Sequence, residues 1–383
     1  MGNVVFGSPR FVKPEVKIPS KCKVEFRPSK DWKGEFGFDW ERISDSQIPV
    51  DIKYSSIIGK YGNVYATKPG AIFTFDNPLY RKHLLEYEVF SLTDLGKYYV
   101  PNMTLMNNET AILDASIEVI EKPDSMYYKY DESIFQVMIL EKLSNNKGKH
   151  YNDKVLKIKC LKEFSSKQKI ELIGTKDKLN TKIGQINVLP NNVVKEVNVL
   201  FIPVDHNGVK GAIKGNEVQI LNNAFRQAYV KGNITKMPKI TVGSWWYDLF
   251  FTKKDKKGKL YMDTSDWRSI HKVLDDVFFE DKTNLIYKDY YRLYMLPDNQ
   301  TLNGMAEDIG NNVRTVVVYQ GRNDSTAPHE LMHAMGLYHT FDNDGLFTYK
   351  FLNTDNIMDY THQTGKQRFS INKWQWKILN SKI

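Results

Sequence analysis

Three histidines, one glutamate and one glycine between residues 329 and 339 have the types and spacing of a catalytic metal site. On an α-helix, His329 and His333 lie one above the other and can bind the same ion. Glu330 follows the first histidine, where its carboxylate can take a proton from a metal-bound water. Gly336 can adopt a positive φ and end the helix, which brings His339 back as a third ligand. Three protein ligands leave a fourth position for water, as in catalytic zinc sites.

The segment His329–His339 resembles the zinc-binding motif of the metzincin metallopeptidases, and Asn356–Tyr360 resembles the methionine turn of that family. The resemblance implies that Met358 is an apolar floor below the imidazoles and not a ligand. It also implies that Tyr360 reaches the metal or the developing oxyanion. The amino-acid sequences of both segments are most similar to those of the pappalysin and cytophagalysin branch. The insert between His339 and Met358 contains no cysteine, which excludes the disulfides of that branch.

The motif and the resemblance together predict a zinc-dependent endopeptidase in which Glu330 is the general base. Three alternatives stay open. The chain could be a binding or delivery protein whose peptidase domain is latent or activated by a partner. Its N-terminal half could be a pro-segment in the cleft. It could also be a zinc amidase that acts on cell-wall peptides.

The 383 residues are enough for two or three domains. We predict all-β structure for residues 1–105 and an immunoglobulin-like sandwich for residues 106–192, where short alternating segments are separated by turn-forming clusters. The N-terminal half weakly resembles β modules of bacterial secretion-system effectors in Trp32–Trp40 and Leu156–Phe164. That resemblance implies a secreted effector or toxin, with secretion machinery or an inhibitor as partner.

Residues 193–383 are predicted to form an α+β catalytic domain of the metzincin type, with a twisted mixed sheet. A continuous apolar strand at Val197–Val204 opens it, and a helix that Ser265 can cap follows later. Pro328 lies in the first turn of the zinc helix, where no N–H is needed. In the family it resembles, the strand before this helix is an edge strand, so we expect Val316–Val318 to bind an extended protein or peptide substrate by backbone pairing.

Composition narrows the remaining functions. The net charge is +9, but the densest lysine cluster, Lys253–Lys259, lacks the interleaved aromatic and arginine residues of a nucleic-acid surface. The two cysteines exclude a disulfide scaffold. No apolar run approaches ~20 residues and the start lacks a signal-peptide core, which predicts synthesis in the cytoplasm and export, if any, by a specialised route. Besides one zinc ion, Asp342 and Asp344 are candidates for calcium binding.

Overall fold

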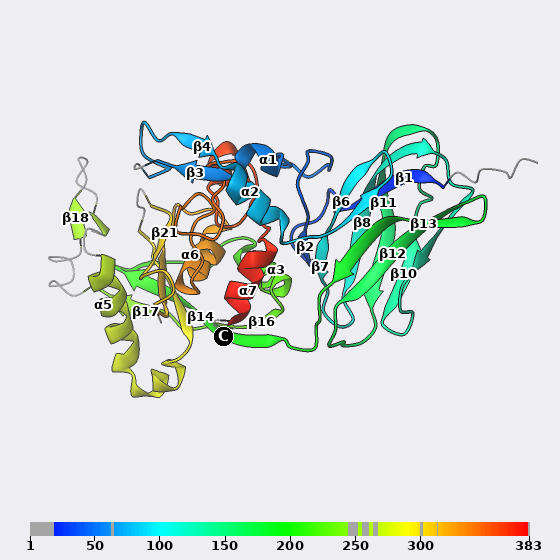
Figure 1. The fold of residues 1–383 in the computed structure, drawn as a ribbon. Helices are drawn as coiled ribbons and strands as arrows, with labels where there is room; N and C mark the ends of the chain where they lie inside the picture. Colours follow the sequence, from blue (N-terminus) through cyan, green and yellow to red (C-terminus); the bar gives the residue numbers. More distant parts are fainter. Residues whose placement is uncertain are drawn as a thin grey trace, which may run out of the picture.

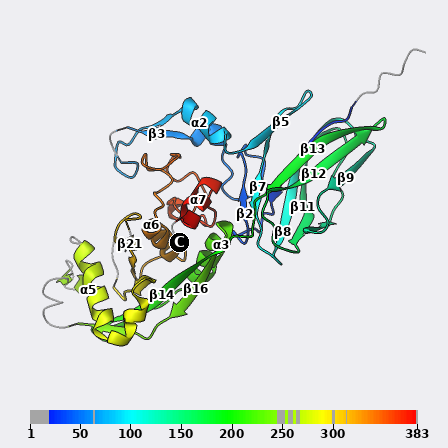
Figure 2. The same ribbon diagram turned by 60° about the horizontal axis from the view of Figure 1, so that its bottom comes forward.

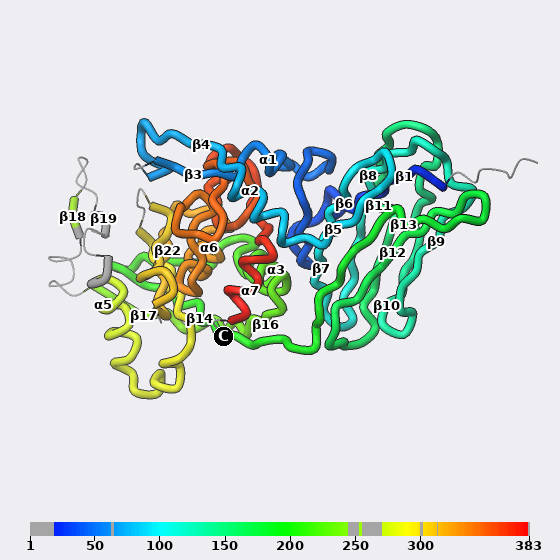
Figure 3. Tube along the Cα trace, in the orientation of Figure 1, coloured from blue at the N-terminus to red at the C-terminus, as the bar shows by residue number. Residues whose placement is uncertain are grey.

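The computed structural model describes residues 19–62, 65–243, 252–254, 260–262, 267–298, 302–311 and 313–381. Figure 1 shows two regions side by side: one built of β-sheets and one in which helices surround a further sheet. The chain crosses between these regions more than once, because early segments lie with the late helices (Figure 3). The two regions are called the sheet region and the mixed region below.

Two sheets form the sheet region. Their strands alternate buried and exposed side chains, and the buried ones from both sheets join one apolar core that includes Val24, Leu113 and Ile186. The first sheet has the order β1 (Lys21–Pro28), β8 (Thr110–Glu121), β11 (Gly148–Cys160), β10 (Phe135–Ile139). The second has the order β2 (Gly37–Asp39), β7 (Asn102–Thr104), β13 (Leu179–Val188), β12 (Gln168–Lys176), β9 (Ser125–Lys129).

All neighbours in these sheets are antiparallel except β7 and β13. The predicted β-rich N-terminal half is thus confirmed, whereas its immunoglobulin-like arrangement stays a prediction. The domain boundaries at 105 and 192 also stay predictions. Cys22 and Cys160 are buried free thiols in this core.

A smaller set of elements connects the regions: α1 (Tyr54–Ile57), β3 (Gly59–Tyr61), β4 (Phe73–Phe75), α2 (Asn77–Leu84), β5 (Glu88–Leu92) and β6 (Gly96–Val100). The β3–β4 hairpin and α2 lie over the mixed region in both ribbon views (Figures 1 and 2). Tyr54 and Ile58 pack there against Phe347, Tyr349 and Trp374 from the end of the chain. A segment near the N-terminus therefore completes an apolar core whose other residues lie near the C-terminus.

The mixed region contains a seven-stranded sheet. Its central strand is β14 (Lys195–His206), which pairs in parallel with β20 (Tyr291–Met295) on one side and with β16 (Val230–Lys236) and β17 (Ile240–Val242) on the other. β15 (Val209–Lys210) forms a short hairpin with β14. On its other side, β20 pairs in parallel with β22 (Thr315–Val318). This mixed α+β architecture is the one predicted at the coarse level, and its assignment to the metzincin fold stays a prediction.

Both faces of that sheet are covered by helices, because successive side chains of a strand point to opposite faces. Val199 and Phe201 of β14 share a core with α3 (Glu217–Gln227), α6 (Thr326–Ala334) and α7 (Lys373–Ser381). Leu200 and Ile202 face α5 (Trp267–Glu280) instead. Two short 3₁₀ segments, η1 (Lys282–Tyr287) and η2 (Thr361–Thr364), complete the described helices.

The edge of the sheet differs from the expectation. Val316–Val318 lie in β22, which is hydrogen-bonded to β20 on one side and antiparallel to β21 (Gly304–Ala306) on the other. The predicted edge position is therefore wrong, and β21 is the edge strand on this side of the sheet among the described residues. The physical reason is burial: all four residues of β22 are buried, as in a central strand, whereas β21 is only partly buried.

Some expected features fall outside the described residues. They are the chain start before residue 19, the lysine-rich segment at 255–259 and the helix cap at Ser265. The lysine segment joins β18 (Thr252–Lys254) to β19 (Leu260–Met262), which form an antiparallel pair. Where the structure describes the chain, no helix is long and apolar enough to cross a membrane.

Candidate metal centre

Helix α6 carries the first two histidines of the site. It begins after Ser325 with Pro328 in its first turn, and its buried apolar side chains join the core beneath the sheet. His329 and His333 are four residues apart on this helix and both are buried. Their Nε2 atoms are 3.1 Å apart, so the helix alone brings two nitrogen ligands together.

Gly336 ends the helix and returns the third histidine to the same place. Its φ is +97°, a left-handed conformation that a side chain would strain. The N–H of Leu337 donates to the carbonyl of Met332 at 2.9 Å, which closes the turn. As a result, His339 Nε2 lies 3.1 Å from His333 Nε2. The ligand atoms of all three histidines lie within 4.8 Å of one another.

Each imidazole has a hydrogen-bond acceptor at its other nitrogen. His329 Nδ1 donates to the Ile357 carbonyl at 2.8 Å, and His333 Nδ1 donates to the Leu337 carbonyl at 2.6 Å. His339 Nδ1 lies 2.8 Å from Asp342 Oδ2. Such outer partners fix the tautomer that leaves Nε2 free for a metal. Burial also lowers the pKa of His329 and His333 well below the ordinary value, so both are neutral ligands at neutral pH.

This donor set fits one zinc ion. Zinc prefers imidazole nitrogens in tetrahedral sites, and three neutral histidines with oriented rings are a common catalytic set. Asp342 orients His339 and Asp344 is exposed, and calcium binding at these two residues stays a prediction. Among the described residues, the three histidines are the group of at least three ligands that lies close enough for a metal.

Glu330 lies beside the histidines and against the edge strand. The N–H of Ala306 in β21 donates to its Oε2 at 3.2 Å. A Cβ on Gly304 would lie 2.8 Å from Glu330 Cγ, so only glycine lets the strand pass this closely. Burial raises the pKa of the Glu330 carboxyl to about 7. Such a group can both take up and release a proton near neutral pH.

The segment Asn356–Tyr360, predicted to be a methionine turn and called by that name below, contacts the same histidines. Met358 is fully buried in the core shared with α6, and its N–H donates to Asn356 Oδ1 at 2.9 Å. Tyr360 places its hydroxyl 3.0 Å from His339 Nε2. Burial raises the pKa of Tyr360, which keeps this hydroxyl protonated and able to donate. The structure therefore brings together His329, Glu330, His333, His339 and Tyr360.

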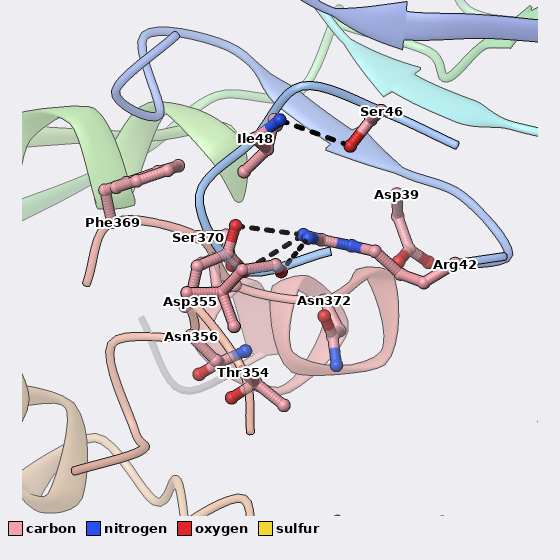
Figure 4. A network of polar contacts seen from close by, with 12 residues as sticks. Asp39, Arg42, Ser46, Ile48, Thr354, Asp355, Asn356, Phe369, Ser370 and Asn372 are labelled. Carbon is pink, nitrogen blue, oxygen red and sulfur yellow. Dashed lines mark hydrogen bonds and ion pairs between the residues drawn. The ribbon is translucent and has the colours of Figure 1, made fainter. Parts of the chain in front are cut away.

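A polar network ties the methionine turn to the N-terminal part of the chain (Figure 4). Arg42 Nη2 lies 2.9 and 3.1 Å from the two carboxylate oxygens of Asp355. Ser370 Oγ donates to Asp355 Oδ1 at 2.6 Å. Asp355 is two residues before Ile357, whose carbonyl orients His329. Nothing in the spacing of the zinc motif points to Arg42.

Two hollows adjoin the site. The smaller one has a volume of about 110 Å³ and is lined by residues that include Gly304, His329, Glu330 and Tyr360. The larger one, of about 530 Å³, lies against α3 and the segment after η2. Arg368 lines both, and sequence reasoning had given it no role, because it lies ten residues beyond Met358 in no recognised spacing.

Comparison of the chain with models of known protein families finds no match, and neither does a search of curated proteins. The functional argument therefore depends on the residues and geometry of the site itself.

Proposed function

We propose that the protein is a zinc-dependent endopeptidase of the metzincin type. The observation that carries the proposal is the convergence of three Nε2 atoms whose Nδ1 atoms all have acceptors, next to a carboxyl with a raised pKa. His329, His333 and His339 would hold the metal. A zinc ion on three imidazoles supplies an acidified water and polarises a carbonyl oxygen.

Glu330 is the proton carrier in this proposal. Its carboxylate accepts a proton from the attacking water and later returns it to the amine that leaves when the peptide bond breaks. The Ala306 N–H holds one carboxylate oxygen, which orients the other for this transfer. Tyr360 donates from its hydroxyl to the oxyanion that develops on the substrate, because that hydroxyl already lies beside His339 Nε2.

Substrate binding is proposed for the edge strand β21. The Ala306 N–H on its outer side donates to Glu330, the other outer backbone groups face no strand among the described residues, and the inner ones pair with β22. An extended peptide could add to it as a further antiparallel or parallel strand beside Glu330. The use of this activity by an effector or toxin is a further proposal that rests on the sequence resemblance of the N-terminal half.

The test combines metal analysis with peptide cleavage. Zinc content and cleavage of a mixed peptide library are measured for the wild type, for Glu330→Gln and for Glu280→Gln, which makes the same change at an exposed position on α5. We expect about one zinc per chain in all three. Cleavage should fall about 100- to 10,000-fold in Glu330→Gln alone, since general-base catalysis is worth that much.

Two results would contradict the proposal: a wild type that binds no zinc, or a Glu330→Gln variant that cleaves as fast as the wild type. Digestion of purified peptidoglycan in place of the peptide library would favour the zinc amidase.

A further inference from the structure

Arg368 is a buried cation next to the proposed metal centre. Its side chain is 3% exposed. Nε donates to Ser325 Oγ at 2.9 Å, and Nη1 donates to the Asp359 carbonyl and lies 3.3 Å from His329 Nδ1. Among the described residues, Nη2 has one acceptor, Asn323 Oδ1, at 3.5 Å. Within the part of the chain that the structure describes, this donor group therefore has no acceptor closer than 3.5 Å.

Other buried arginines of the chain are paired differently. Arg322 is bound by Glu217, and Arg42 by both oxygens of Asp355. Arg368 forms no ion pair within 4 Å of a carboxylate of the described residues, although the carboxyl groups of Glu330 and Asp359 lie close enough to interact with its charge. A buried guanidinium without a directly bonded carboxylate is costly, so such a site favours an anionic ligand.

The smaller hollow is where such a ligand would meet Arg368. Its lining includes Gly304, Thr326, Glu330, Tyr360, His362 and Arg368. Burial lowers the pKa of His362 to about 4, so that imidazole is neutral near pH 7. Arg368 is then the positive side chain of the lining, and Glu330 is its acidic side chain. The hollow has a volume of about 110 Å³, which is enough for several waters or a short side chain.

The proposed proton transfer by Glu330 indicates which part of a substrate would enter this hollow. Glu330 must return its proton to the amine of the leaving fragment, so the residue that carries this amine lies next to Glu330. Glu330 and Arg368 line the same hollow. The side chain that follows the cleaved bond is thereby directed toward Arg368.

We propose that Arg368 makes this hollow a carboxylate subsite, so that the enzyme cleaves peptide bonds on the N-terminal side of an acidic residue. The proposal rests on the peptidase function proposed above. The same chemistry would accept the α-carboxylate of a C-terminal residue, and peptides with blocked and free C-termini distinguish these two sources.

The first experiment is a cleavage profile of the zinc-loaded full chain on a library of peptides blocked at both ends. Matched substrates with Glu, Asp or Gln after the cut are then compared by kcat/KM. We expect a preference of about 10- to 100-fold for the acid over Gln, because a hydrogen bond to a charged group contributes about 1.5–3 kcal/mol. Faster cleavage only in peptides with a free C-terminus would assign the subsite to the α-carboxylate and overturn the side-chain proposal.

Variants of Arg368 test whether this side chain causes the preference for an acidic residue. Arg368→Gln should lose it while zinc content stays unchanged, and Arg368→Lys should retain part of it. Lys366→Gln removes the same charge at an exposed position outside the smaller hollow and should leave the preference intact. A preference that survives in Arg368→Gln would overturn the proposal. The profile of the wild type decides the matter even where Arg368→Gln does not fold.

A binding measurement separates this inference from the peptidase function. Binding of N-acetyl-glutamate α-amide and of its glutamine counterpart to the metal-free full chain can be followed by ligand-observed NMR. We expect the acid to bind about tenfold more tightly, and Arg368→Gln to bind both equally. A chain that cleaves nothing but shows this difference would contradict only the peptidase function. Equal binding, or cleavage without acidic preference, would overturn the carboxylate subsite.

Discussion

Two buried arginines show how the two regions of the molecule differ. In the sheet region, Arg27 binds both oxygens of Asp45 at 2.7 Å, and the partners are 18 residues apart. In the mixed region, Asp355 is bound by Arg42, which is 313 residues away in sequence. The first pair joins two segments of the N-terminal part. The second joins the N-terminal part to the segment that orients His329.

The comparison indicates that the N-terminal part is a structural component of the site. Tyr65, next to the β3–β4 hairpin, places its hydroxyl 3.4 Å from His339 Nδ1. Tyr61 and Asn343 exchange two backbone-to-amide hydrogen bonds at 3.1 and 2.8 Å. A removable pro-segment would cover the metal-binding side of the histidines. These contacts instead involve His339 Nδ1, which faces away from the proposed metal, and Asn343, which follows His339 in the chain.

Removal of residues 1–192 gives the largest expected effect. A chain that starts at Val193 would leave Asp355 buried without Arg42 and would expose Phe347, Tyr349 and Trp374. Because whole-domain stability is only about 5–15 kcal/mol, we expect no cooperative unfolding transition and no stoichiometric zinc binding. Circular dichroism on heating and metal analysis measure both. A shortened chain that is folded and more active than the full one would instead support the pro-segment.

Single substitutions at the two arginines test the comparison more finely. Arg42→Ala leaves the Asp355 carboxylate buried without its partner, which should cost about 3–5 kcal/mol of unfolding free energy. Because Asp355 precedes Ile357 and the methionine turn, we also expect weaker zinc binding. Denaturant unfolding and zinc titration against a chelating indicator provide the two readouts.

Arg27→Ala is the matched control for that substitution. Asp45 is more exposed than Asp355, so the loss of stability should be smaller, and zinc affinity should not change. If both variants lower zinc affinity equally at equal stability, the contrast between the two regions fails.

The sequence predicted the residues of the metal site better than the long-range contacts that hold them in place. The order of His329, Glu330, His333, Gly336 and His339 is local, so helix periodicity and one glycine determine how their side chains converge. The coarse division into a β-rich half and an α+β half followed from periodicity in the same way. These inferences need only the shape of one or two neighbouring elements.

Long-range features escaped the sequence analysis because no local pattern encodes them. The pairing of Arg42 with Asp355 and the burial of Arg368 depend on how distant segments pack. The edge of the sheet was misplaced for a related reason: β21 is three partly buried residues with one glycine, too short to show a period, whereas β22 has the apolar run of a strand.

The smallest predicted effect concerns Glu41, a carboxyl at the border of the two regions. Its side chain is 6% exposed, accepts a hydrogen bond from Tyr80 at 2.7 Å, and lies near the neutral His83. Burial raises the pKa of Glu41 to about 7. The folded state therefore retains this proton where the unfolded chain, near its ordinary value of 4.5, has lost it.

For a carboxyl whose pKa is raised by folding, the stabilising contribution is complete below the unfolded pKa and is lost as the pH rises through the folded one. Glu41→Gln keeps a neutral acceptor for Tyr80, so its stability relative to the wild type should rise between about pH 4.5 and pH 7, by about 1–3 kcal/mol. Denaturant unfolding at pH 4.5, 6 and 8 measures the difference, and Glu141→Gln repeats the change at an exposed position of the sheet region. A flat difference for Glu41→Gln would mean that this border is hydrated and that the two regions are less tightly joined than the Arg42–Asp355 pair implies.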